Sequence, residues 1–202
     1  MLDINRYPFC CPLANRTSIN VKQFEMRNTI YPTAQATAYL ILVLLCSSLL
    51  GCNRSFRPTV KTGFEGEPLP EFKLLLPDSN TVINTADIPK GSPIVLVYFS
   101  PNCPYSQAEM TNIINDISNL KGVRFCILTS WPFSQLKGFY AYYQLHKYQN
   151  IVVGEDFNNY FSGHFKPIGV PFTMIYNREK KLSNAFVGTM PGLQLENITA
   201  NN

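Results

Sequence analysis

The stretch from Ile94 to Ser106 decides the fold, and its sequence is IVLVYFSPNCPYS. Its first half is apolar, with the length and the β-branched content of a strand that is buried on both faces. Proline follows the cysteine directly, and proline is favoured at the first position of an α-helix because the N–H that it lacks has no partner there. The stretch therefore predicts a buried strand, a short connection and a helix that begins at Pro104.

Cys103 directly precedes this predicted helix. Unpaired backbone N–H groups at a helix N-terminus favour the thiolate, which is the nucleophilic form of cysteine. A two-cysteine redox motif would place its second cysteine where this chain has Ser106. A serine hydroxyl can donate a hydrogen bond to a thiolate, but it cannot displace sulfur from a disulfide. The predicted catalytic residues are therefore Cys103 as the nucleophile and Ser106 as its neighbour.

The composition excludes several classes of function. The chain has 202 residues and a formal net charge of +4, which allows one domain with an extension. This charge is too small for a nucleic-acid-binding surface, and the sequence has no basic stripe with interleaved aromatic residues. The six cysteines lack the paired spacing of metal ligands, and the two histidines are isolated. We therefore expect no metal site, no cofactor and no nucleic-acid partner.

An apolar segment over residues 38–50 has the sequence AYLILVLLCSSLL. It is shorter than the roughly 20 residues that a membrane-spanning helix needs, and it is typical of the core of a secretory signal. Met26, which is followed by an arginine, would give such a signal a natural start. We therefore expect residues 1–25 to be an over-called N-terminal extension and residues 26–51 to be a signal segment.

The signal segment leads into LLGC at positions 49–52, which resembles the lipobox of bacterial lipoproteins. The resemblance implies that Cys52 becomes the lipidated first residue of the mature chain, and that a lipid anchor holds the protein in the bacterial cell envelope, facing the periplasm. A weak membrane anchor with an incidental cysteine is the alternative. Residues 52–65 are then a polar tether, and residues 66–202 are the globular domain.

The domain is expected to open with a β-hairpin and to continue with alternating strands and helices. Besides the strand before Cys103, the apolar pattern predicts strands over 72–76, 81–83, 123–129, 151–153, 172–176 and 185–188. It predicts helices over 104–120, 134–148 and about 191–200, with one or two helical turns within 156–161. This order indicates an α/β fold with a mixed sheet flanked by helices.

Cys126 is predicted to lie in the middle of the strand over 123–129. A cysteine in such a strand usually packs in the core as a small hydrophobic residue. The alternative is a resolving role toward Cys103, which would require the two Cα atoms to lie within roughly 7 Å of each other.

Four motifs of the domain resemble the thioredoxin fold and, within it, the bacterial redoxin group of extracytoplasmic thiol–disulfide oxidoreductases. They are Gly66-x-Pro68-x-Pro70-x-Phe72, Lys90-Gly91-Ser92-Pro93, the junction at Cys103 followed by Glu109-Met110, and Gly169-Val170-Pro171. The resemblance covers about Gly66 to Ala200. It implies that the bond between Val170 and Pro171 is cis and faces the thiol, and cis bonds are essentially restricted to X–Pro.

The resemblance also implies a substrate-binding edge, where the backbone before the proline pairs with an extended peptide. Its residues would be Pro104, Tyr105, Val170 and Pro171. The sequence departs from the family at two positions: Asn102 stands where the family has tryptophan, and Ser106 stands where it has the resolving cysteine. The family often has an acidic residue beneath the site, which the sequence does not identify.

Three functions fit one reactive thiol in this fold. The first is thiol–disulfide exchange through a mixed disulfide, with protein disulfides or capped thiols as substrates and an external thiol as reductant. The second is a binding module that keeps the groove beside the proline without turnover. The third is a one-cysteine peroxidase, although Leu96 stands where a peroxiredoxin-like site has proline. We expect the first function.

Overall fold

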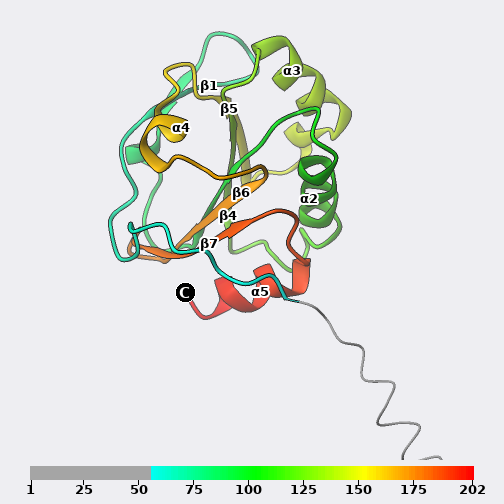
Figure 1. Cartoon of the computed structure of the whole chain (residues 1–202). Helices are drawn as coiled ribbons and strands as arrows, with labels where there is room; N and C mark the ends of the chain where they lie inside the picture. The colour runs from blue at the N-terminus through cyan, green and yellow to red at the C-terminus, as the bar shows by residue number, and fades with distance from the viewer. Residues whose placement is uncertain (1–55) are drawn as a thin grey trace, which may run out of the picture. The chain divides into compact units, whose positions relative to one another are not determined.

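The computed structural model describes residues 56–202 of the protein (Figure 1). The strands are β1 (Lys73–Leu75), β2 (Val82–Asn84), β3 (Ile94–Tyr98), β4 (Arg124–Thr129), β5 (Ile151–Glu155), β6 (Phe172–Tyr176) and β7 (Leu182–Val187). The α-helices are α2 (Pro104–Asn115), α3 (Phe133–Tyr142), α4 (Tyr160–Phe165) and α5 (Gly192–Ala200). Two short 3-10 helices, η1 (Thr85–Asp87) and η2 (Leu145–Lys147), complete the described elements.

The seven strands form one mixed sheet in the order β2-β1-β5-β4-β3-β6-β7. β3 is parallel to β4 and antiparallel to β6, and β4 is parallel to β5. The hairpin of β1 and β2 extends one edge of the sheet, and β7 forms the other edge. Every residue of β3 is buried, as expected for a strand that is apolar on both faces. The predicted fold class, a thioredoxin-like mixed sheet flanked by helices with an N-terminal hairpin, is confirmed.

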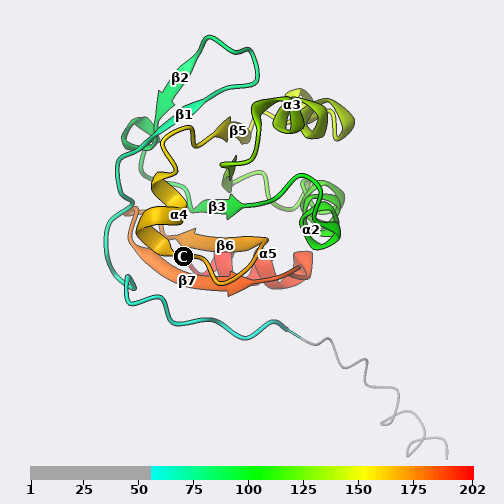
Figure 2. The same ribbon diagram turned by 45° about the horizontal axis from the view of Figure 1, so that its top comes forward.

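Two apolar cores lie on opposite faces of this sheet. The first core contains residues of α2, α3 and α5, and the second contains residues of α4 and of the chain before β1. Figures 1 and 2 show α2 and α3 on one side of the strands and α4 on the other. Successive residues of a strand face opposite sides, so Val97 of β3 belongs to the first core and Leu96 to the second.

The helix predicted over 104–120 is shorter in the structure, because α2 ends at Asn115. The chain continues in single turns, in which the N–H of Asn119 bonds to the carbonyl of Asp116 at 2.9 Å. Asp and Asn side chains compete for backbone hydrogen bonds and therefore favour turns over helix. Leu120 is nevertheless buried in the first core, so its apolar spacing predicted a longer helix than the one that forms.

The helix predicted over 134–148 is divided into two pieces. α3 ends at Tyr142, and Gln144 adopts a left-handed backbone conformation with a φ of 51°, which interrupts a right-handed helix. η2 follows and buries Leu145 in the first core. Glutamine is not typical of left-handed positions, so the sequence contained no signal for this break.

The helical turns expected within 156–161 begin later, because α4 starts at Tyr160. Asp156 precedes the helix, and its buried carboxylate accepts the N–H of Tyr160 at 3.0 Å and that of Phe161 at 2.7 Å. These bonds satisfy N–H groups that have no partner within the first turn of a helix. Asp156 therefore caps α4 from outside the helix instead of beginning it.

The described part of the expected tether, residues 56–65, lies against the domain. The N–H of Val60 bonds to the carbonyl of Ala185 in β7 at 2.8 Å. The backbone N–H and carbonyl of Arg57 bond to the side chain of Gln194 in α5, each at 2.7 Å. The expected extension, the signal segment and Cys52 lie outside the described residues. Within residues 56–202, no helix has both the length and the apolar character needed to span a membrane.

Candidate active site

Cys103 lies at the junction between β3 and α2. Its N–H bonds to the carbonyl of Ser100 at 3.1 Å, and its own carbonyl accepts the N–H of Gln107 at 3.0 Å. Cys103 is thus the N-cap residue of α2, and Pro104 follows in the first turn as the sequence predicts. Cys103 is partly exposed to solvent.

The loop before β6 brings Val170 and Pro171 to this cysteine. β3 and β6 are antiparallel neighbours with Tyr98 opposite Phe172, so the residues just before β6 lie beside those just after β3. The bond between Val170 and Pro171 is cis, as predicted. The Cys103 thiol donates to the carbonyl oxygen of Val170, with an Sγ–O distance of 3.7 Å. The structure therefore places the thiol and the proline-bearing loop in one site.

Ser106 faces the interior of the domain. It is 2% exposed, and its hydroxyl accepts the N–H of Ser100 at 3.3 Å. In the described part of the chain, no hydrogen bond joins the Ser106 hydroxyl to the sulfur of Cys103. Ser106 therefore fixes the connection between β3 and α2, and the expected hydrogen bond to the sulfur is not present in this structure.

Apolar side chains flank the thiol on two elements. Tyr105 in the first turn of α2 is 64% exposed, and Ile168 in the loop that carries Val170 is 82% exposed. The carbonyl of Tyr105 accepts the hydroxyl of Thr189 at 3.1 Å, which connects α2 to the segment between β7 and α5. Of the predicted substrate-binding residues, Val170 contacts the sulfur through its carbonyl and Tyr105 is exposed, while Pro171 is buried. Their role in substrate binding stays a prediction.

Glu109 is a buried acid in α2 and belongs to the motif that follows Cys103. It is 1% exposed, and its carboxylate accepts the N–H of Met190 at 2.6 Å. Burial raises the pKa of Glu109 to about 7, while the N–H of Met190 and the charge of Arg57 act in the opposite direction. The signal for it was a glutamate next to Met110 on the apolar face of the predicted helix.

The position of Glu109 relative to the thiol follows from helix geometry. A rise of 1.5 Å per residue places its Cα about 9 Å along the axis from that of Cys103. Asn112, one turn further, donates to the carbonyl of Met190 at 3.1 Å, so α2 binds both backbone groups of Met190. Glu109 is therefore a candidate for the buried acid that the family resemblance implies, although it makes no hydrogen bond to the sulfur among the described contacts.

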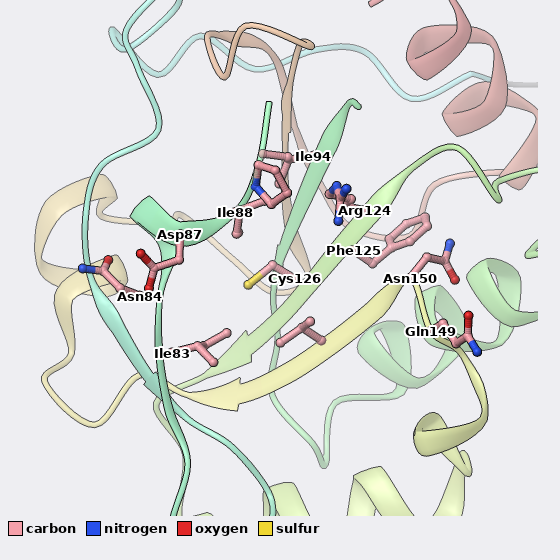
Figure 3. A pocket seen from close by; sticks show the side chains of 12 residues that line it. Ile83, Asn84, Asp87, Ile88, Ile94, Arg124, Phe125, Cys126, Gln149 and Asn150 are labelled. Atoms are coloured by element: carbon pink, nitrogen blue, oxygen red, sulfur yellow. The ribbon is translucent and has the colours of Figure 1, made fainter. Parts of the chain in front are cut away.

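Cys126 lies in β4 and belongs to the second core, on the face of the sheet opposite α2. Its thiol is almost completely buried, and burial raises its pKa to about 12. Its side chain lines a cavity of about 210 Å³, and Figure 3 shows the sulfur between Ile83 and Ile88. Neither Cys103 nor Cys126 forms a disulfide within the described residues. The expectation that Cys126 packs as a core residue is confirmed.

Metal ligands do not gather in the described part of the chain. Residues 56–202 contain no group of three or more His, Cys, Asp or Glu side chains that could hold a metal ion.

Comparison with solved structures gives the fold. The chain is similar to the solution structure of a putative thioredoxin from Neisseria meningitidis, with 18% identity over 65% of this chain and 87% of that one, at a TM-score of 0.55. It is similar to the thioredoxin domain of a thiol-disulfide oxidoreductase from Bacteroides vulgatus, with 15% identity over 68% and 96% and a TM-score of 0.55. A secreted disulfide oxidoreductase of Mycobacterium tuberculosis, homologous to E. coli DsbE, matches with 18% identity over 65% and 96% and a TM-score of 0.54.

These similarities define the class of fold. The domain is thioredoxin-like, with the sheet order and the thiol junction described above. No protein-family model and no curated protein matches the sequence.

Proposed function

We propose that the protein exchanges thiols and disulfides through the single thiol of Cys103. The observation that supports this most directly is the 3.7 Å contact between its Sγ and the carbonyl of Val170. The contact combines a nucleophile at a helix N-terminus with the backbone edge beside Pro171, which is the arrangement needed to hold a substrate next to the sulfur.

The exchange proceeds in two balanced steps. The Cys103 thiolate attacks one sulfur of a substrate disulfide, the S–S bond breaks, and the second substrate sulfur leaves as a thiolate that takes a proton. An outside thiol, or another thiol of the same substrate, then attacks the mixed disulfide and releases Cys103. The protein itself gains and loses no electrons over the cycle, so the reaction fits disulfide isomerisation or removal of a thiol cap.

The Val170 carbonyl takes part in substrate binding in this proposal. It accepts the Cys103 S–H in the resting structure. Ionisation of the thiol removes that donor, and the carbonyl can then accept an N–H from an extended substrate backbone. The same carbonyl can thereby hold a substrate strand beside the sulfur.

We also propose that a lipid on Cys52 holds the domain at the bacterial cell envelope, facing the periplasm. The support is the LLGC pattern at the end of the apolar segment 38–50. Growth of the host with labelled fatty acid should label the wild-type chain but not a Cys52→Ala variant. Equal labelling of the two chains would contradict the anchor.

The proposed exchange is tested with oxidised peptides and the variants Cys103→Ser and Cys126→Ser. Mass spectrometry should locate a mixed disulfide on Cys103 in the wild type and in Cys126→Ser, and Cys103→Ser should carry none within residues 56–202. Peptide binding that is equal in the wild type and in Cys103→Ser, with no adduct, would instead indicate a binding module. Consumption of peroxide with a small-thiol reductant would indicate the peroxidase alternative.

A further inference from the structure

A cavity of about 320 Å³ lies between α3 and the connection that leads to the thiol, and Asn102, the residue before Cys103, lines it. α2 and α3 are neighbours on the same face of the sheet (Figures 1 and 2). The cavity walls include Asn102 and Gln107 on the thiol side and Gly138, Tyr142 and Tyr143 on the α3 side. The volume is at the lower end of the roughly 300–1,000 Å³ of ligand sites, which suits one large side chain better than a cofactor.

Three hydrogen bonds pair several of the polar groups that line this cavity. The Asn102 side-chain amide donates to the side-chain oxygen of Gln135 at 3.2 Å. The Gln107 side chain donates to the carbonyl of Pro101 at 3.0 Å, and the Tyr143 hydroxyl donates to the Gln107 carbonyl at 3.1 Å. An occupant therefore meets mainly the faces of aromatic rings and carbon surface.

The charge of the cavity excludes ionic occupants. None of the described residues that line it is an Asp, Glu, Lys or Arg. A carboxylate or an ammonium group placed here would lose water without gaining an opposite charge. The ring of Tyr142, which is 79% exposed, offers instead a surface that an apolar or aromatic side chain would cover.

Asn102 forms part of one wall of this space. Position 102 precedes the nucleophile, and the family that this sequence resembles has tryptophan there. Asn102 is smaller, and its amide reaches across to Gln135 on α3. The α3 side of the cavity also has free space, because Gly138 has no side chain there. Gly138 is exposed, and a Cβ built on it would meet no atom within 4 Å.

We propose that this cavity is a substrate subsite, which binds a bulky uncharged side chain next to the reacting cysteine of a protein substrate. The inference rests on the proposed thiol–disulfide exchange, because the cavity opens beside the residue that precedes Cys103. The substrates are then protein segments with an aromatic or large aliphatic residue beside a cysteine. Small acidic thiols do not belong to this class.

The experiment compares three peptides of the form Gly-X-Cys-X-Gly, with X as tryptophan, aspartate or glycine. Each peptide carries its cysteine as a disulfide with 2-thiopyridine, so attack by Cys103 forms the mixed disulfide and releases 2-thiopyridone, which is measured by absorbance. We expect the rate constant for the tryptophan peptide to exceed those for the aspartate and glycine peptides by at least about tenfold.

Two variants fill the cavity from opposite walls. Gly138→Leu projects a side chain from α3, and Asn102→Trp places a ring from the thiol side. Both should reduce the preference for tryptophan to about threefold or less. Gly163→Leu in α4 is the matched control, because this helical glycine also has no atom within 4 Å of a built Cβ and lies outside the cavity. The control should keep the full preference.

Equal rates for the three peptides with the wild type would overturn the subsite, and so would an undiminished preference in Gly138→Leu. A second measurement separates this failure from failure of the exchange reaction. Peptides with serine in place of cysteine are titrated into the protein, and the backbone amide signals of Gln135 and Gly138 are followed by NMR. Shifts with the tryptophan peptide alone support the subsite even if Cys103 proves unreactive, and absence of such shifts contradicts it.

Discussion

The carboxylate of Glu109 accepts the N–H of Met190 at 2.6 Å, which ties the helix that carries the thiol to the segment before α5. Thr189, the preceding residue, donates its hydroxyl to the carbonyl of Tyr105 in the first turn of the same helix. The Arg57 side chain also bonds to the carbonyl of Thr189, at 2.9 Å. The position of the active-site helix thus depends on a buried acid and on residues from both ends of the domain.

Replacement of Glu109 by glutamine should change how stability depends on pH. The pKa of Glu109 rises from 4.5 to about 7 on folding, so the folded protein binds more protons than the unfolded chain between these values. Stability therefore falls as pH rises from about 4.5 to about 7, by about 3 kcal/mol in total. Glu109→Gln keeps an acceptor for Met190 and loses this slope.

Urea unfolding at several pH values between 4 and 8 measures this effect. The free energy of unfolding should converge for the wild type and Glu109→Gln at low pH, and the variant should be the more stable one at pH 8. Parallel curves over the whole range would show that Glu109 does not titrate in this window.

Introduction of a second cysteine at position 106 should shorten the life of the mixed disulfide. Residues three apart in a helix lie on the same face, so a thiol in Ser106→Cys is near Cys103 and can displace the substrate. Release of the peptide without added thiol should become at least about tenfold faster than in the wild type. Mass spectrometry over time follows the loss of the adduct.

Ala108→Cys supplies the matched control, because it adds an exposed thiol to the same helix on a different face. Its adduct should be as durable as that of the wild type. If both cysteine variants release the peptide at the same rate, the position of Ser106 relative to the sulfur has no special importance.

A methyl group at Gly154 should destabilise the domain. Gly154 is in β5, and a Cβ built there would lie 2.7 Å from the Cβ of Leu74 and 3.3 Å from the carbonyl oxygen of Leu75. Leu74 and Leu75 belong to β1, the strand that pairs with β5, so their atoms cannot easily move aside. Gly154→Ala should therefore lower the free energy of unfolding by about 1–3 kcal/mol.

Gly163→Ala is the reference for this measurement, because its built Cβ meets no atom and alanine has the higher helix propensity. Chemical denaturation should show it to be at least as stable as the wild type. A Gly154→Ala protein of unchanged stability would mean that β1 and β5 are less closely packed than described.

The sequence predicted the parts of the fold that depend on long apolar runs. β3 and the thiol at the N-cap of α2 match this expectation, and the cis bond before Pro171 matches what the family resemblance implies. The predicted end of the helix over 104–120 was wrong. Leu120 is buried, but it lies in a turn after α2, because apolar periodicity reports burial and not helix length. The left-handed Gln144 had no residue-type signal at all.

The site was less predictable than the fold. Cys103 could be found because strand and helix signals meet there, and the Val170–Pro171 pair was found through the family resemblance. The interior position of Ser106, the burial of Glu109 and the cavity beside Asn102 depend on how α2 packs against α3 and α5. Contacts of this kind join residues that are distant in the chain, and local sequence patterns do not report them.

The central claim is that Cys103 alone carries the exchange. The most direct test incubates the domain with an oxidised peptide and identifies the modified residue by mass spectrometry after removal of excess peptide. If Cys103 alone carries the exchange, each chain should bind one peptide, on Cys103. This adduct should persist until an external thiol is added and should then disappear. A chain that remains unmodified at Cys103, or that carries the peptide on Cys126 instead, would contradict it.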